Sequence, residues 1–145
     1  MRFNTDFEAI IHCCQEGRTG WITPALITVY REVHELGYVV TAGTYREGQL
    51  VGGLWGIGIG RIFSIMSMFH REDYAGALAL AALVDIVSGD GPWSVIDCGV
   101  MVPHFEMYGA REISERKFCE LVWNSLKQPD RFRCASLADT TVMPE

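Results

Sequence analysis

The spacing of apolar residues along the first part of the chain predicts two helices. Between residues 7 and 14 they recur at the i, i+3, i+4, i+7 spacing of one helix face, which predicts a helix over residues 4–15. Thr23 and Pro24 are a helix N-cap and a first-turn proline, so a second helix is predicted from there to Gly37.

The next part of the chain predicts a β-hairpin. Residues 38–45 are rich in β-branched side chains, Glu47-Gly48 is a turn signal, and residues 49–63 are expected to form one long strand. That strand contains five glycines, a content that indicates bulges or the close approach of another backbone or ligand. A short strand is expected at residues 65–69.

The second half of the chain predicts further helices alternating with strands. The expected elements are a helix at 72–87, a buried strand at 93–98, a short helix at 103–108, a final strand at 110–113 and a helix at 114–126. This order indicates an α/β fold with a mixed sheet. We expect one domain over residues 1–128 and a loose C-terminal tail over residues 129–145.

Composition excludes several classes of protein. The 145 residues are 49% hydrophobic, too many for intrinsic disorder, yet no uninterrupted apolar run is long enough to predict a transmembrane helix. The first residues lack an apolar signal region, so a cytoplasmic protein is expected. A net charge of −6 argues against autonomous binding of DNA or RNA, although a local basic patch remains compatible with it.

Few residues indicate chemistry when taken alone. Asp97 is the one acid inside an apolar strand, where a buried carboxylate needs hydrogen-bond donors or an altered pKa, and this favours either a site or a structural role. No metal site is predicted, because the five cysteines include no C-x-x-C pair, and they are expected to be reduced thiols. The glycines at 56, 58 and 60 have the wrong spacing for a dinucleotide-binding loop.

Several stretches taken together resemble one family. They are GWITP at 20–24, HELG at 34–37, LVGGLWG at 50–56, SMFHR at 67–71, VIDC at 95–98, Pro103-His104 and YGAREI at 108–113. In order and spacing they are similar to leucyl/phenylalanyl-tRNA–protein transferases, over most of the chain from about residue 2 to about residue 120.

The resemblance implies a GNAT-like acyltransferase domain with a mainly antiparallel sheet. Family members move Leu, Phe or Met from aminoacyl-tRNA to the N-terminal amine of a protein, without metal or CoA. Positioning can supply much of the rate when an amine attacks an activated ester. The implied partners are aminoacyl-tRNA and a protein or small amine acceptor, with no membrane and no DNA.

The resemblance also assigns site residues. Asp97 matches the family's acid and is the catalytic candidate. Trp21 matches the tryptophan near the tRNA 3′ adenosine, and the substrate-binding candidates beside it are Leu54, Phe63, Met66, Ser67 and Leu80. We expect Leu54, Phe63, Met66 and Leu80 to line one apolar pocket. The basic residues near the C-terminus, Arg116, Lys117 and Lys127, are the candidates for weak, salt-sensitive contact with tRNA.

The chain departs from the family at polar positions. Relatives have AHSVE where this chain has VVTAG at 39–43, and NASK where it has YAGA at 74–77. Their acid in GESMF is Met66, and their glutamine after Asp-Cys is Gly99. The family's N-terminal domain is also expected to be missing. Losing the acid removes a charged hydrogen bond worth about 1.5–3 kcal/mol, so an N-terminal Arg or Lys should be recognised poorly.

Three functions remain open at this point. The first is an aminoacyl-tRNA-dependent transferase with an altered acceptor, and the second is a catalytically degenerate relative acting as a binding or structural subunit. The third hypothesis, a CoA-dependent acetyltransferase, has the weakest support of the three, since no Q/R-x-x-G-x-G/A loop precedes a helix. Self-association or a permanent partner chain is expected through a face bearing Trp21, Trp55, Ile65 and Tyr74.

Overall fold

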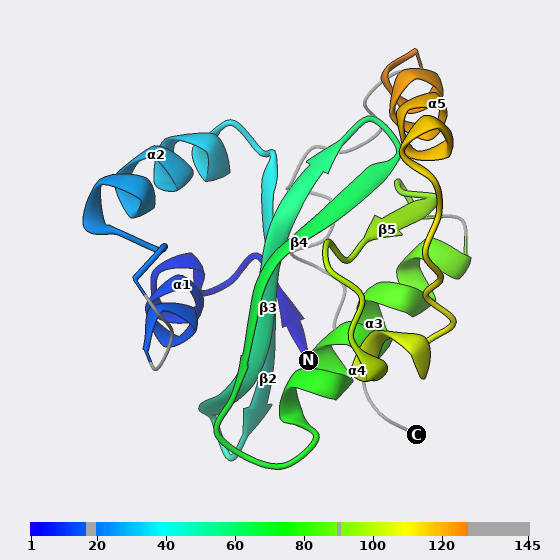
Figure 1. Cartoon of the computed structure of the whole chain (residues 1–145). Coiled ribbons are helices and arrows are strands. Elements are labelled where there is room, and N and C mark those ends of the chain that lie inside the picture. Colours follow the sequence, from blue (N-terminus) through cyan, green and yellow to red (C-terminus); the bar gives the residue numbers. More distant parts are fainter. Residues whose placement is uncertain (17–19, 90, 128–145) are drawn as a thin grey trace.

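The computed structural model describes residues 1–16, 20–89 and 91–127 of the chain. Strands and helices follow one another along the chain as Figure 1 shows, and the bounds of each element follow. They are β1 (Arg2–Phe3), α1 (Phe7–Gln15), α2 (Pro24–Glu35), β2 (Val39–Arg46), β3 (Gln49–Ile59), β4 (Ile62–His70), α3 (Ala75–Ser88), β5 (Val95–Asp97), α4 (Pro103–Glu106) and α5 (Glu115–Leu126).

The strands form one mixed sheet in the order β1-β2-β3-β4-β5. Neighbouring strands are antiparallel from β1 to β4, whereas β4 and β5 run parallel. This confirms the predicted class, an α/β domain with a mainly antiparallel sheet flanked by helices. Within the described part of the chain, no helix is both long enough and apolar enough to span a bilayer.

The second and last helices begin where the sequence predicts. Thr23 caps α2 by accepting a hydrogen bond from the Leu26 amide, with Pro24 in the first turn. Ser114 caps α5 in the same way through the Lys117 amide. These side chains satisfy amides that the first turn of a helix leaves without partners.

The hairpin is confirmed, but its long strand is interrupted. Glu47 and Gly48 form the β2–β3 turn with φ values of +51° and +82°. A second turn at Gly60, with φ of +58°, ends β3 and starts β4, so the prediction of one strand over 49–63 is wrong. A Cβ at Gly60 would also lie 2.6 Å from the backbone of Ser125. Only a glycine combines this turn with that close approach.

The glycine-rich strand β3 makes room for aromatic rings. A Cβ at Gly56 would lie 2.6 Å from the Phe63 ring, and one at Gly58 would lie 2.6 Å from the Trp93 indole. A β-bulge at Val51 of β3 shifts its register with β2 between Thr44 and Tyr45, and a second bulge, at Met66 of β4, shifts the register between Trp55 and Gly56. The predicted bulge and close approach are therefore confirmed, and the glycines serve packing.

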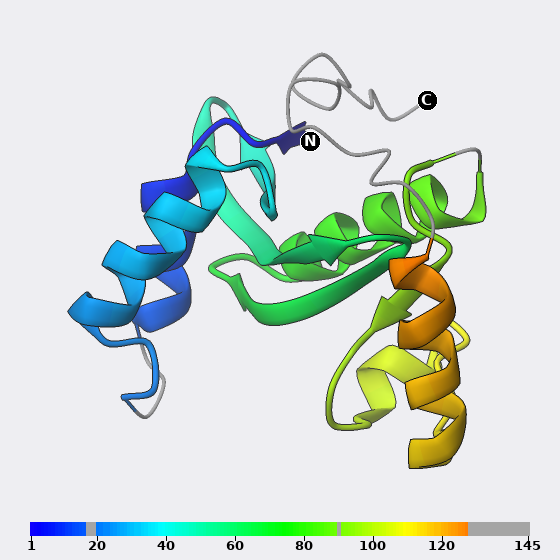
Figure 2. The same ribbon diagram turned by 90° about the horizontal axis from the view of Figure 1, so that it is seen from above.

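The sheet separates two apolar clusters. One lies on the face covered by α3 and includes Leu54, Phe63, Leu80 and Trp93. The other lies on the face covered by α1 and α2 and includes Trp55 with apolar residues of both helices. Figure 2 shows α1 and α2 on one side of the strands, with α3, α4 and α5 on the other.

The segment after α4 differs from the prediction. Residues 110–113 form no strand, and β5 is the last strand of the described sheet. Asp97 therefore ends an edge strand, so its predicted place in an interior strand is wrong, although its place at a strand end is confirmed. The reason is that the Ala110 amide donates to the Phe105 carbonyl of the preceding turn, and residues 110–113 pair with none of the strands in the described ranges. The predicted tail over 129–145 lies outside the described residues.

Candidate active site

Asp97 is held at the point where β5 leaves the sheet. It is paired in register with Ser64 of β4, and the Ser64 hydroxyl donates to its carboxylate at 3.1 Å. The Gly99 amide donates to the other carboxylate oxygen at 2.9 Å. Gly99 makes this bond with φ of +68°, a conformation that glycine adopts without strain. A turn thus fixes a half-buried carboxylate at the edge of the fold.

A groove of about 680 Å³ lies along this turn. One wall is residues 95–101, and the other is residues 110–113 with Glu115 and Phe118. Its charged side chains are the acids Asp97, Glu112 and Glu115 and the single base Arg111. A groove with this excess of carboxylates favours a cationic or amine ligand over a phosphate.

The thiol beside the carboxylate is kept protonated. Burial raises the pKa of Cys98, and the negative charge of Asp97 raises it further. A thiolate is the nucleophilic form, so Cys98 is a poor nucleophile near neutral pH. The four described cysteines, Cys13, Cys14, Cys98 and Cys119, are all free thiols, and Cys134 lies outside the described residues.

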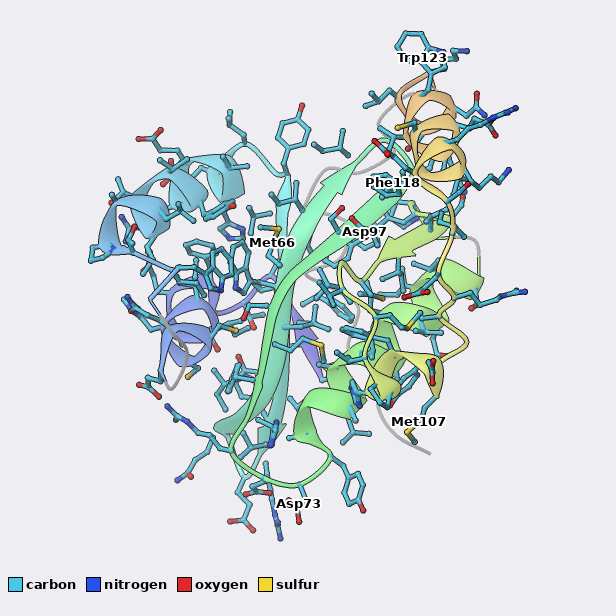
Figure 3. The ribbon with its side chains drawn as sticks, in the orientation of Figure 1. Met66, Asp73, Asp97, Met107, Phe118 and Trp123 are labelled. Atoms are coloured by element: carbon cyan, nitrogen blue, oxygen red, sulfur yellow. The ribbon has the colours of Figure 1, made fainter. Side chains whose placement is uncertain are left out.

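The structure does not bring the predicted pocket residues together. Leu54, Phe63 and Leu80 are fully buried in the cluster under α3. Met66 packs against the other cluster, beneath α1 and α2, because it lies three residues after Phe63 on the continuous strand β4, where successive side chains point to opposite faces. The expectation of one apolar pocket lined by all four is therefore wrong. Figure 3 shows Met66 and Asp97 on different sides of β4.

Trp21 and Ser67 lie on the same face as Met66. Trp21 is 40% exposed, and its ring stacks on that of Trp55 with centroids 6.2 Å apart. Ser67 is buried and paired in register with Trp55. Its hydroxyl has no hydrogen-bond partner among the described residues. The assignment of these residues to substrate binding stays a prediction.

The predicted basic patch lies on α5 and at its end. Arg116 forms an ion pair with Glu120 at 3.1 Å, and Lys117 is 3.9 Å from the same carboxylate. The ammonium of Lys127 lies over the Trp123 ring, 5.3 Å from its centroid. All three bases are exposed, but Glu120 offsets part of their charge. Their contact with tRNA stays a prediction.

The four residues expected on an interaction face do not form one. Trp55 is fully buried, so its predicted exposure is wrong, because Tyr30 and Trp21 pack against its ring. Ile65 is half-buried against the cluster under α3. Tyr74 is 81% exposed at the start of α3, on the opposite face of the sheet from Trp21. Self-association or a partner chain stays a prediction.

Sequence reasoning missed the residues that surround Asp97. Ser64 reaches it only through the register of two parallel strands, and no spacing along the chain specifies that register. Glu112 and Glu115 join the groove because residues 110–113 are not a strand and pass alongside residues 95–101 instead. The two acids Glu112 and Glu115, three residues apart after Gly109, were the one signal that could have indicated an acidic groove wall.

Comparison with known proteins identifies the family of this chain. The family model described as leucyl/phenylalanyl-tRNA protein transferase matches residues 1–123. A relative of that name from Syntrophobacter fumaroxidans is 39% identical over 133 residues, covering 88% of this chain and 56% of its own length. One from an Azoarcus species is 40% identical, covering 82% and 52%, and one from Methylibium petroleiphilum is 41% identical, covering 81% and 46%.

The matched region includes every element that builds the groove as far as Trp123 of α5. The chain spans about half the length of these curated relatives. Because the family model covers most of the chain, the chain belongs to the leucyl/phenylalanyl-tRNA–protein transferase family.

Proposed function

We propose that this chain transfers an aminoacyl group from tRNA to an amine, the reaction that the names of its relatives indicate for them. The observation that carries the proposal is the Asp97 carboxylate, fixed by Ser64 and Gly99 at the mouth of an acidic groove. A carboxylate held in this way can orient an incoming amine, because it attracts the ammonium form and accepts the proton that must leave.

The reaction needs no group beyond the two substrates. The amine nitrogen attacks the ester carbonyl of the aminoacyl-tRNA, a new C–N bond forms, and the C–O bond to the terminal ribose breaks. The amine loses a proton, and the ribose oxygen gains one. Most of the acceleration comes from holding amine and ester together, which converts a bimolecular step into an effectively unimolecular one.

The charges around the site suggest how the two substrates are oriented. The groove carries Asp97, Glu112 and Glu115, which favour the amine, whereas Arg116 and Lys117 of α5 and Lys127 just after it are the bases that would contact a phosphate backbone. Met66 stands where relatives have an acid, and it packs against an apolar cluster. We therefore propose an acceptor with an uncharged N-terminal side chain in place of Arg or Lys.

The test is a transfer assay. The protein is incubated with radiolabelled Leu-, Phe- or Met-tRNA and peptides that differ only in the N-terminal residue, with a protein-free control. Transfer above that control supports the proposal, and preference for uncharged N-termini supports the altered acceptor. We expect Asp97→Asn to lower the rate by about 10²–10⁴-fold. Asp73→Asn is the matched control, because Asp73 is exposed far from the groove (Figure 3) and its variant should keep the parent rate.

One observation favours a second candidate, a relative that binds but does not transfer. Gly99 replaces the glutamine of relatives, and its φ of +68° disfavours any residue with a side chain. A Cβ there would meet nothing within 4 Å, so the site has space for a side chain that the sequence does not supply. Binding of peptide without transfer, for every aminoacyl-tRNA tested, would favour this second function.

A further inference from the structure

Helix α5 exposes an aromatic ring that the core of the protein does not use. Trp123 is 65% exposed and belongs to neither apolar cluster, whereas the buried Ser125 attaches the helix to the body of the fold through the Arg61 amide. Figure 3 shows Trp123 projecting away from the sheet at the far end of α5. A single exposed apolar side chain is ordinary on a protein surface, so the groups around this ring decide what it could bind.

Two cations lie on the same face of the helix as this ring. Intervals of four, three and four residues, which keep side chains on one stripe of a helix, separate Arg116, Glu120, Trp123 and Lys127. We call these four residues the α5 stripe. The Lys127 ammonium lies over the Trp123 ring, 5.3 Å from its centroid, and this cation–π contact holds the ring in place. An exposed ring flanked by cations is an arrangement that binds single-stranded nucleic acid, because every base can stack on a ring and every phosphate is an anion.

The one acid of the stripe is held by weak contacts. The Glu120 carboxylate lies 3.1 Å from Arg116 and 3.9 Å from Lys117, and the Arg116 side chain is 90% exposed. Exposed ion pairs are weak and are screened by salt, so a phosphate can replace the carboxylate on Arg116. With Lys127 included, the helix carries three bases and two acids, whereas the whole chain has a net charge of −6. The charge of α5 is therefore complementary to a phosphate backbone, unlike that of the chain as a whole.

Helix α5 leads from the candidate active site to this ring. Glu115 and Phe118, near the start of the helix, line the same groove as Asp97. Trp123 lies five residues after Phe118, a rise of about 7.5 Å along the helix axis. In the view of Figure 3, Phe118 lies between Asp97 and Trp123. The 3′ end of a tRNA carries the aminoacyl ester and is single-stranded. An end that presents its ester at Asp97 can therefore place a preceding nucleotide against α5.

We propose that Trp123 stacks on an unpaired base near the 3′ end of the donor tRNA, with Lys127 and Arg116 contacting the phosphates on either side of that base. Stacking on a ring tolerates any base, so this site adds affinity and fixes the direction of the strand without reading its sequence. The inference rests on the proposed function for the identity of the RNA. RNA binding is measured without transfer, so the two are tested separately.

The first test removes the ring and the unpaired bases in turn. Two RNA hairpins with the same stem and a 5′ fluorophore are titrated with the protein at low salt, one with four unpaired nucleotides at its 3′ end and one blunt, and anisotropy gives each Kd. Trp123→Ala should bind the first hairpin about tenfold more weakly and the blunt hairpin within about twofold of the parent. Trp123→Phe keeps a ring and should restore most of the affinity.

Leu126→Ala is the matched control for this test. Leu126 is 55% exposed on the same helix but has no ring, so its variant should bind both hairpins like the parent. Circular dichroism and the urea midpoint verify the fold of each variant. Replacing the four unpaired nucleotides by four others should change the Kd of the parent by less than about threefold, because stacking does not read base edges.

Several outcomes would overturn the proposal. They are an equal loss of affinity by Trp123→Ala for the two hairpins, no loss for either hairpin, and no binding of RNA by the parent. Sedimentation identifies the competing occupant, since a dimer of the free protein that Trp123→Ala dissociates would mean that a second copy covers this face. Transfer without the dependence on unpaired bases leaves the proposed function standing and removes this inference. That dependence without transfer does the reverse.

The second test changes the charges of the α5 stripe. Lys127→Gln should lower the slope of log K against log salt concentration by about 0.7, the value for one phosphate contact of a single strand. Glu120→Gln removes the competing carboxylate and should tighten binding of the hairpin with unpaired nucleotides about twofold to threefold. Asp73→Asn is its matched control, because it removes the same charge at an exposed position away from α5 (Figure 3). Equal affinities of Glu120→Gln and Asp73→Asn, or an unchanged slope for Lys127→Gln, would contradict the phosphate contacts.

Discussion

The sheet with α1, α2 and α3 differs sharply from the segment that follows it. We call residues 1–89 the body and residues 91–127 the outer segment. The body contains nearly all of the buried side chains, including both apolar clusters, whereas only Trp93 and Ser125 are buried in the outer segment. Yet the groove walls and the candidate catalytic carboxylate belong to the outer segment. Stability and candidate chemistry are thus carried by different parts of one domain.

The largest test of this difference compares one substitution in the two regions. Phe63 is fully buried under α3, and its ring is tilted against that of Trp93 with the ring centroids 4.6 Å apart. Phe118 on α5 is 36% exposed. Phe63→Ala should lower the free energy of unfolding by about 3–5 kcal/mol, because it removes apolar contacts and leaves a cavity. Phe118→Ala should cost less than about 1 kcal/mol. Urea denaturation measures both, and similar losses would mean that α5 is part of the core.

The contrast between the two regions also explains what the sequence could predict. The helix cap at Thr23, the start of the last helix near Ser114, the Glu47-Gly48 turn and the buried stripes of the body are local patterns, and they were predicted correctly. The turn at Gly60 was missed because its glycine resembles the others in that run. The outer segment lacks a strong apolar period, so residues 110–113 were assigned to a strand that does not form.

The candidate site was predicted only at its centre. Asp97 stood out because an acid interrupts an apolar run, which is a local signal. Ser64 depends on strand register, which no spacing along the chain specifies. Met66 lies three residues after Phe63, so alternation places it on the opposite face once one strand is known to run from Ile62 to His70, and the sequence prediction had divided that strand between residues 63 and 65.

The second test concerns the attachment of α5 to the body. The Ser125 hydroxyl accepts a hydrogen bond from the Arg61 amide and lies 3.4 Å from the Ile59 carbonyl, to which it donates. Ser125→Ala leaves the Arg61 amide without this acceptor, at a cost of about 1–3 kcal/mol. We expect faster hydrogen exchange confined to α5 and the Gly60 turn. Unchanged exchange in α5 would show that the helix is anchored elsewhere.

The third test asks whether the body also carries function. The Ser67 hydroxyl is buried without a hydrogen-bond partner among the described residues, which is costly in a folded protein. Ser67→Ala should therefore raise the free energy of unfolding by about 1 kcal/mol. If Ser67 binds substrate, the more stable variant should transfer or bind peptide more weakly than the parent. A loss of stability would mean that the hydroxyl has a partner when the protein is in solution.

The smallest effect is a difference in thiol reactivity within the outer segment. Cys98 is half-buried beside Asp97, and Cys119 is exposed on α5. Burial, and after it the charge of Asp97, raises the pKa of Cys98, so less thiolate is present at a given pH and alkylation is slower. Labelling by iodoacetamide, resolved by mass spectrometry, should be slower at Cys98 than at Cys119 near pH 8, and should accelerate as the pH rises toward the pKa of Cys98.

Asp97→Asn should lower that pKa toward the ordinary value and accelerate labelling of Cys98 without changing the labelling rate of Cys119. Because burial is the larger cause, the acceleration should be only partial. An equal rate of Cys98 labelling in the parent and in Asp97→Asn would mean that the carboxylate does not lie near the thiol. It would also contradict the turn that holds Asp97 at the groove.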